Sequence, residues 1–251
     1  MAETEAGVHI QGQYVQGQHG RGHIVAMGGC PLEVLPESLR LHRYVLALAE
    51  KDRPKVCFVP TAGGESPPHI VTYYATFTQL NTVPSHLSLF SLPTADLRSY
   101  LLDHDIIYVG GGNTKSMLAL WREWGLDAIL REAWQAGKVL AGSSAGSICW
   151  FEAGITDSIP GPLTPLPCLG YLAGSNCPHY DSEEQRRPTY QRLIAQGRIP
   201  PGYASEDHVG LHYAGTQLAR IVTGRSGGRA YRVERDGESA VEMPIAAELL
   251  G

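Results

Sequence analysis

The chain has 251 residues, of which 43% are hydrophobic, 18% are charged and 29 are glycine. This length and composition predict a soluble globular protein with a sizeable core and many tight turns. The formal net charge is only −5 and no basic stripe is visible, so nucleic acid is not expected as a partner.

The N-terminal segment contains acidic residues and lacks the apolar core of a signal peptide, so it does not predict secretion. No apolar run approaches the roughly 18 residues of a transmembrane helix, and no membrane partner is expected. The five cysteines are scattered without a CxxC pair and predict no disulfide framework. These features predict a cytoplasmic protein. The first twenty or so residues are rich in Gly and Gln and weakly patterned, which predicts a mobile arm at residues 1–22, and the lack of an internal repeat or linker predicts a single α/β domain at residues 23–251.

Short apolar runs alternate with segments of helical period along the first two thirds of the chain. Strands are predicted at residues 23–29, 55–64, 86–92, 104–114 and 138–146, with helices at 38–50, 67–81 and 115–137. Such alternation is typical of a parallel sheet covered by helices on both faces. The pattern loosens among prolines after Gly154, and residues 208–224 and 229–244 then predict antiparallel hairpins.

Three of the predicted strands end in glycine, at Gly28-Gly29, Gly110–Gly112 and Gly142–Gly146. Ligands of open α/β sheets bind beyond the carboxyl ends of the strands. We therefore expect these three glycine-rich ends to face one crevice.

The segment Gly142-Ser143-Ser144-Ala145-Gly146 fits the pattern G-x-S-x-G at a junction between a strand and a helix. Small neighbours let the backbone turn sharply and expose a reactive hydroxyl at Ser144, while the N–H of Ala145 can donate to an oxyanion. A plain glycine-rich turn explains the same residues equally well. The motif alone leaves both interpretations open.

The segment Gly110-Gly111-Gly112-Asn113-Thr114 has three interpretations. Asn113 or Thr114 can cap the following helix. The glycines can hold a small anion, although neither phosphate-loop pattern is present. Alternatively, the amide of Gly112 or Asn113 supplies a second donor to an oxyanion.

A serine nucleophile also needs a base and an acid that orients it. Of ten histidines, His179 in "SNCPHYDSEEQRR" is the strongest candidate, because it follows an extended segment before proline and precedes a polar loop. The residues leave four acids open as its partner: Asp157, Asp181, Glu206 and Asp207. Cys177-Pro178-His179 is the nearest approach to a zinc-binding pattern. The role of general base is favoured over that of metal ligand for His179, so no metal site is expected.

"YVGGGNT", then "GSSAG" with Ser144 31 residues after Asn113, then "NCPHY" resemble the motifs of the peptidase E (aspartyl dipeptidase) group of the S51 serine peptidases, to which cyanophycinases are related. The resemblance covers residues 106–180 and extends more loosely to residue 233. It implies an α/β three-layer sandwich with a mostly parallel central sheet, similar to class I glutamine amidotransferases and flavodoxin-like folds.

The resemblance also implies roles for individual residues. Ser144 corresponds to the nucleophile, His179 to the general base, and the amides of Gly112 and Ala145 to the oxyanion hole. Asp207 is the favoured third member of the triad, with Glu206 and Asp157 as alternatives. No metal or organic cofactor is implied.

One position departs from the family. Aspartyl dipeptidases carry an arginine in the loop after the histidine, which pairs with the carboxylate of the substrate. Aligning Glu184-Gln185-Arg186 with the family's E-Q-R places Glu183 at that position, where a carboxylate would repel the substrate's own. Arg186 or Arg187 could replace the missing arginine, or both could belong to a solvated helix face. Asn113, Glu183, Arg186 and Arg187 are therefore the candidate substrate-binding residues.

The expected activity is hydrolysis of short peptides by a Ser-His-acid triad through an acyl-enzyme, without assured specificity for aspartyl substrates. One alternative is a cyanophycinase-like exopeptidase. Another is a non-catalytic protein of amidotransferase-like fold that binds a small ligand. A homodimer is compatible with the sequence, although no segment identifies its interface.

Overall fold

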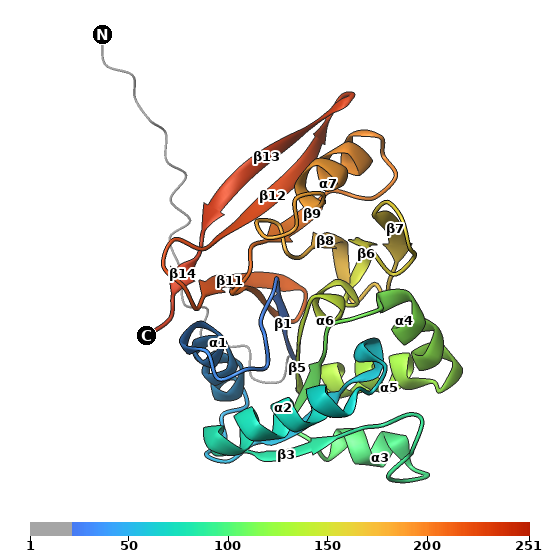
Figure 1. The fold of residues 1–251 in the computed structure, drawn as a ribbon, viewed down its shortest axis with the longest axis vertical. Helices are drawn as coiled ribbons and strands as arrows, with labels where there is room; N and C mark the ends of the chain where they lie inside the picture. The colour runs from blue at the N-terminus through green and yellow to red at the C-terminus, as the bar shows by residue number, and fades with distance from the viewer. Residues whose placement is uncertain (1–21) are drawn as a thin grey trace.

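The computed structural model describes residues 22–251 (Figure 1). The arm predicted at residues 1–22 lies outside the described residues, except for Gly22. The helices are α1 (Pro36–Ala47), η1 (Thr61–Gly63), α2 (Pro67–Phe77), η2 (Thr78–Leu80), α3 (Leu97–Leu102), α4 (Thr114–Glu123), α5 (Leu126–Gln135), α6 (Ala145–Ile148) and α7 (Arg186–Ala195).

The larger of two sheets has eight strands in the order β14-β11-β10-β1-β5-β4-β2-β3. Its five strands from β1 to β3 are parallel, whereas β10 pairs antiparallel with both β1 and β11. The strands of this sheet are β1 (His23–Met27), β2 (Lys55–Val59), β3 (Val83–His86), β4 (Ile106–Val109), β5 (Val139–Ser143), β10 (Val209–Ala214), β11 (Gln217–Thr223) and β14 (Glu248–Leu249).

Alternate residues of the central strands belong to two different hydrophobic clusters. In β1, Ile24 and Ala26 pack in the cluster that contains the buried residues of α3, α4 and α5. Val25 and Met27 face the other side and pack in the cluster that contains those of α1 and α2. Because successive side chains of a strand point to opposite faces, an apolar strand needs cover on both. The predicted three-layer α/β sandwich with a mostly parallel sheet is confirmed.

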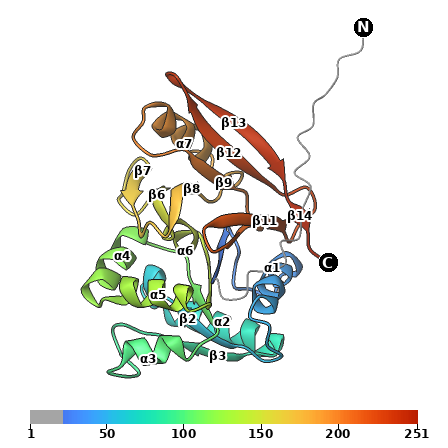
Figure 2. The same ribbon diagram turned by 180° about the vertical axis from the view of Figure 1, so that it is seen from behind.

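The second sheet contains six strands in the order β13-β12-β9-β8-β6-β7. It lies beyond one end of the large sheet, with α7 packed on β12 and β13 (Figures 1 and 2). These strands are β6 (Phe151–Thr156), β7 (Thr164–Pro167), β8 (Leu172–Cys177), β9 (Gly202–Ser205), β12 (Arg229–Asp236) and β13 (Ser239–Ala246).

Two element predictions differ from the structure. The strand predicted at 86–92 is wrong in position, because β3 ends at His86 and the amide of Leu89 then donates to Glu65 Oε1 at 2.6 Å instead of to β2. The helix predicted at 115–137 is divided at Gly125, whose φ of +65° ends α4 and starts α5. The hairpins β10–β11 and β12–β13 are confirmed. Within residues 22–251, no helix is long and apolar enough to cross a membrane.

Two tryptophans of the same region allow a matched test of the core. Trp121 of α4 is fully buried and its indole N–H donates to Thr61 Oγ1 at 3.1 Å, whereas Trp124 is 42% exposed. We expect Trp121→Ala to lower the free energy of unfolding by about 3–5 kcal/mol because it leaves a large cavity. Trp124→Ala should change it by about 0.5 kcal/mol or less. Urea unfolding measures both; equal losses would contradict this assignment of the core.

Candidate active site

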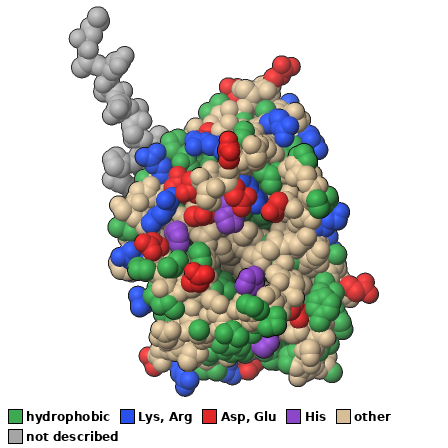
Figure 3. Space-filling view, in the orientation of Figure 1, with side chains coloured by type: hydrophobic (Ala, Val, Ile, Leu, Met, Phe, Trp, Pro, Cys, Tyr) green, Lys and Arg blue, Asp and Glu red, His purple; other side chains and the backbone are tan. Residues whose placement is uncertain are grey.

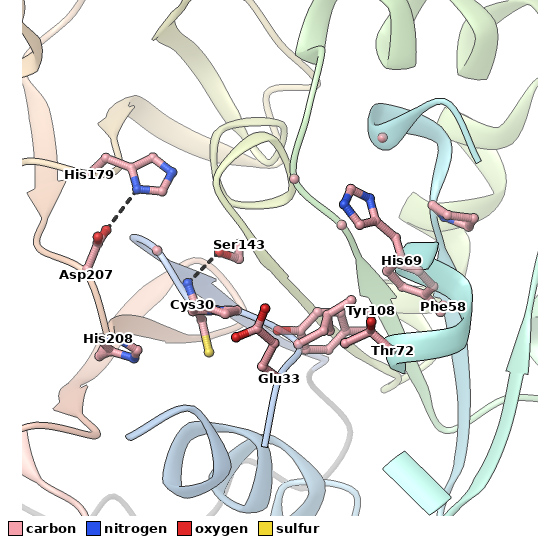
Figure 4. Close-up of a pocket in the computed structure, with 17 residues that line it drawn as sticks. Cys30, Glu33, Phe58, His69, Thr72, Tyr108, Ser143, His179, Asp207 and His208 are labelled. Carbon is pink, nitrogen blue, oxygen red and sulfur yellow. Dashed lines mark hydrogen bonds and ion pairs between the residues drawn. The ribbon is translucent and has the colours of Figure 1, made fainter. Parts of the chain in front are cut away.

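The three glycine-rich strand ends meet at one pocket, as expected. A pocket of about 370 Å³ is lined by Gly29 after β1, by Gly110 and Gly111 after β4, and by Ser143 at the end of β5. His179 and Asp207 form one wall (Figure 4). Figure 3 shows a hollow on this face of the molecule with histidine and acidic side chains at its rim.

Ser144 occupies a sharp turn between β5 and α6. Its φ of +58° and ψ of −112° lie outside the regions that residues other than glycine prefer. Its amide donates to the carbonyl of Gly28 at 3.1 Å, which ties the turn to the end of β1. Ser143 is instead buried, and its hydroxyl accepts a 2.8 Å hydrogen bond from the amide of Cys30. Of the two adjacent serines, only Ser144 is partly exposed.

The glycines on either side of Ser144 are required by close packing of the backbone. A Cβ atom at Gly142 would lie 2.5 Å from the carbonyl oxygen of Gly146, and one at Gly146 would lie 2.3 Å from that of Val109. Gly111 approaches from β4, where an added Cβ would lie 3.2 Å from Ser144 Cβ. The G-x-S-x-G pattern therefore has a steric cause at this turn.

His179 and Asp207 form a hydrogen-bonded pair at the pocket. His179 Nδ1 lies 2.8 Å from Asp207 Oδ1 (Figure 4). The Asp207 amide donates to Asp181 Oδ1 at 2.8 Å. Burial raises the pKa of Asp207, but hydrogen bonds from His179 and Ser182 outweigh it and hold that pKa below its ordinary value. Asp207 therefore stays ionised at neutral pH and can orient the imidazole.

The two alternative acids have other partners. Glu206 accepts hydrogen bonds from the side chain of Arg225, the amide of Arg229 and the hydroxyl of Tyr231, all between 2.7 and 3.0 Å. Asp157 lies 3.8 Å from Arg186 Nη2 and is 65% exposed. Among the described residues, Asp207 is the acid that the structure brings to His179 Nδ1.

The two amides predicted for the oxyanion hole have no hydrogen-bond partner within residues 22–251. Ala145 is the first residue of α6, so its N–H has no partner within that helix. The amide of Gly112 has no hydrogen bond within residues 22–251, and its φ of +134° and the 2.2 Å between an added Cβ and the Ala62 carbonyl oxygen require glycine there. Asn113 instead caps α4, where its side chain accepts from Ser116 N at 2.9 Å and donates to Ser158 O at 2.9 Å.

The two candidate arginines are both engaged. Arg186 is 2% exposed, and its Nε donates to Glu183 Oε2 at 2.6 Å while Nη1 donates to the carbonyl of Ile155 at 3.0 Å. Arg187 pairs with Glu242 and its guanidinium lies over the rings of Tyr180 and Tyr231. Arg186 does not lie on a solvated face, and neither arginine lines the pocket.

The sequence did not indicate the wall opposite His179. It is formed by Glu33 in the loop after β1, by His69 and Thr72 of α2, and by the rings of Phe58 and Tyr108 (Figure 4). No local motif marks these residues, because they come from separate segments of the chain and meet only in the folded protein. The only signal was their position after predicted strands, or on the helix that follows one.

The cysteines of the chain are free thiols, and most are buried. Cys30 lines the pocket, but burial raises its pKa to about 12, so it is a poor nucleophile at neutral pH. Within residues 22–251, no group of three or more His, Cys, Asp or Glu side chains could hold a metal ion.

Within residues 22–251 no hydrogen bond joins Ser144 to His179, but Ser143 and Gly111 line the pocket that contains the His-Asp pair. A strained serine between a strand and a helix, with such a pair at the same strand ends, is typical of hydrolases. The model of peptidase family S51 matches residues 24–221, and the chain belongs to this family. The chain is 50% identical over 228 residues to the uncharacterized peptidase YgaJ of Bacillus subtilis (strain 168), covering 91% of this chain and 99% of that protein.

Two further similarities agree with this family. The chain is 33% identical over 203 residues to peptidase E of Shewanella denitrificans (strain OS217), covering 77% of this chain and 82% of that one. The crystal structure of a peptidase from an acI-B1 actinobacterium has the same fold, with a TM-score of 0.67 at 16% identity over 90% of this chain and 95% of that one. The similarity to the peptidase E group is confirmed, and the family indicates a hydrolase.

The close approach of Gly29 to the His-Asp pair provides a test of this geometry. A Cβ atom at Gly29 would lie 2.2 Å from Asp207 Oδ1 and 2.9 Å from His179 Cε1. We expect Gly29→Ala to displace the pair and to lower kcat for peptide hydrolysis about 100-fold. Gly210→Ala is the control, because its Cβ would lie no closer than 3.4 Å to any neighbour. Equal activity of the two variants would contradict the role of this approach.

Proposed function

We propose that the protein is a serine peptidase of the S51 type that hydrolyses short peptides through an acyl-enzyme. The observation that carries the proposal is the 2.8 Å hydrogen bond between His179 and Asp207 at the pocket. Gly111 lines the same pocket, and a Cβ atom added to it would lie 3.8 Å from the hydroxyl oxygen of Ser144. In this assignment Ser144 is the nucleophile, His179 the general base and Asp207 the orienting acid.

Each step of the reaction has a group to perform it. His179 Nε2 takes the proton of Ser144 Oγ as this oxygen attacks the carbonyl carbon of the peptide bond. The amides of Gly112 and Ala145 donate to the oxyanion that forms. His179 then gives the proton to the leaving nitrogen as the C–N bond breaks, and the acyl group remains on Ser144. Water attacks the ester with loss of a proton to His179, and the proton returns to Ser144 as the acid leaves.

The depressed pKa of Asp207 supports its part in this cycle. An ionised Asp207 accepts from the Nδ1–H of His179, which leaves the Nε2 lone pair free to take the serine proton. When His179 becomes an imidazolium, the adjacent carboxylate stabilises it. Asp207 itself needs no proton at any step.

The size of the pocket favours short substrates. About 370 Å³ is within the range of small-ligand sites, and the wall of Phe58, Tyr108 and His69 limits its extent. Aspartyl specificity is not part of the proposal. Arg186 and Arg187 are both paired with carboxylates, and no lysine or arginine is among the residues that line the pocket.

The nucleophile is tested by two adjacent substitutions. We expect Ser144→Ala to lower kcat for dipeptide hydrolysis by at least about 1,000-fold, because the acyl-enzyme cannot form. Ser143→Ala is the matched control: it removes the hydrogen bond to Cys30 and should cost about 1 kcal/mol of stability while leaving kcat within about tenfold. A Ser144→Ala protein that still turns over, with purity established by mass spectrometry, would refute the assignment. Peptide binding without turnover by the wild type would instead indicate a binding protein.

The acid is tested by comparing neighbours in the sequence. Asp207→Asn should lower kcat about 10,000-fold because the amide favours the wrong imidazole tautomer. Glu206→Gln should leave kcat within a few-fold but lower the melting temperature, since Glu206 accepts three hydrogen bonds from other elements. If Glu206→Gln abolished turnover and Asp207→Asn did not, Glu206 would be the third member of the triad.

A further inference from the structure

Glu183 is the carboxylate that lies beside the outer nitrogen of His179. Its Oε1 is 4.0 Å from His179 Nε2, while Asp207 occupies the opposite side of the ring at Nδ1. Glu183 follows His179 by one helical turn, with its amide donating to the His179 carbonyl at 3.1 Å. In the proposed reaction Nε2 handles the protons of the serine and of the leaving amine, so Glu183 lies close to the reacting atoms.

Arg186 fixes the orientation of Glu183. The guanidinium is almost wholly buried and is anchored to the Ile155 carbonyl, and its Nε holds Glu183 Oε2 at 2.6 Å. The other oxygen, Oε1, is the one nearest to His179 Nε2. A buried arginine therefore binds one oxygen of Glu183 and leaves the second without that partner, 4.0 Å from His179 Nε2.

The charge around this oxygen is negative. One guanidinium, that of Arg186, faces two carboxylates, those of Glu183 and Asp157. Across the pocket, the carboxylate of Glu33 is directed inward and makes no ion pair within residues 22–251 (Figure 4). The lining residues include no lysine or arginine but do include the rings of Phe58 and Tyr108. Carboxylates and aromatic faces stabilise a cation and disfavour an anion.

A peptide substrate carries suitable cations near its scissile bond. The α-ammonium of an N-terminal residue is two bonds from the carbonyl carbon, hence about 2.5 Å from it. The side chain of lysine or arginine extends a cation further into the pocket. Either cation can form a charge-assisted hydrogen bond with a carboxylate that is already oriented.

We propose that Glu183, oriented by Arg186, is a specificity-determining residue that accepts a cationic amino or guanidinium group of the residue preceding the scissile bond. The substrates are then short peptides with a free N-terminus or a basic residue at that position, and acidic residues are disfavoured. This proposal rests on the proposed peptidase function, and Arg186 acts in it as a positioning residue.

The test compares full-length wild type, Glu183→Gln and Glu184→Gln on Lys-Leu, Ala-Leu, Asp-Leu and N-acetyl-Ala-Leu. The amide introduced by Glu183→Gln keeps an oxygen that can accept from Arg186, so the fold is expected to persist, and melting curves check it. Glu184 is an exposed neighbour and serves as the control of equal charge change. For peptides that carry the recognised cation, we expect Glu183→Gln to lower kcat/KM about 10- to 100-fold, mainly through KM, with Glu184→Gln unchanged.

The panel separates the two sources of the cation. If the α-ammonium is bound, acetylation of Ala-Leu lowers wild-type kcat/KM by a similar factor, and Glu183→Gln removes the difference. If the side chain is bound, Lys-Leu exceeds Ala-Leu in the wild type but not in the variant. Equal kcat/KM for the free, acetylated, lysyl and aspartyl peptides in the wild type would overturn the proposal, as would equal losses on all four in the variant.

Binding to the Ser144→Ala protein separates this proposal from the proposed function. Calorimetric titration with Lys-Leu, Ala-Leu and N-acetyl-Ala-Leu measures the cation requirement without turnover. If the wild type hydrolyses nothing but Glu183→Gln on the Ser144→Ala background weakens binding of cationic peptides about 10-fold or more, the peptidase assignment fails and the cation site stands. If hydrolysis depends on Ser144 but binding is equal with and without the cation, the peptidase assignment stands and the cation site fails.

Discussion

The candidate site depends on how closely the strand ends pack against one another. Gly142 and Gly146 leave no space for a Cβ beside each other and beside Val109, and Gly29 leaves none beside the His-Asp pair. His179 and His208, which line the pocket, and Ser144, which follows the pocket-lining Ser143, all have positive φ angles. Each such residue costs about 1–3 kcal/mol. The apolar layers on both faces of the sheet offset this strain, so the rigid part of the fold holds the unfavourable backbone in place.

The sequence could predict those parts of the molecule whose signal is local. The apolar strands, the glycine-rich ends and the turn at Ser144 each show their pattern within a few residues. The choice between Glu206 and Asp207 needs the structure, since both follow β9 and only tertiary contacts direct Glu206 to Arg225 and Tyr231 and Asp207 to His179. The strands β6 to β8 were not predicted, because the prolines of this segment interrupt the pattern of a strand. The pocket wall that contains Glu33 and His69 has no motif, because only tertiary packing brings those residues to the pocket.

Two adjacent arginines after His179, Arg186 and Arg187, have different environments in the fold. Arg187 remains at the surface with Glu242, whereas Arg186 turns inward and becomes one of the most buried large side chains of the chain. Burying a guanidinium costs solvation free energy, which a carbonyl and two carboxylates offset only if the geometry is good. Such an arrangement gives little net stability, but it restricts the rotamers of the groups that contact it. Of these groups, Glu183 also approaches His179, with 4.0 Å between Oε1 and Nε2.

The protonated thiols of the chain have a consequence for its chemical durability. Peroxide and alkylating reagents attack thiolates, and burial raises the pKa of Cys30, Cys57 and Cys168 to about 12 and that of Cys149 and Cys177 above the ordinary range. A hydrolase of this fold that relied on a cysteine would be inactivated whenever its nucleophile was oxidised. If Ser144 is the nucleophile, as proposed, an alcohol performs the reaction and the thiols stay protonated, so oxidising conditions that inactivate a thiol-dependent counterpart would leave this protein active.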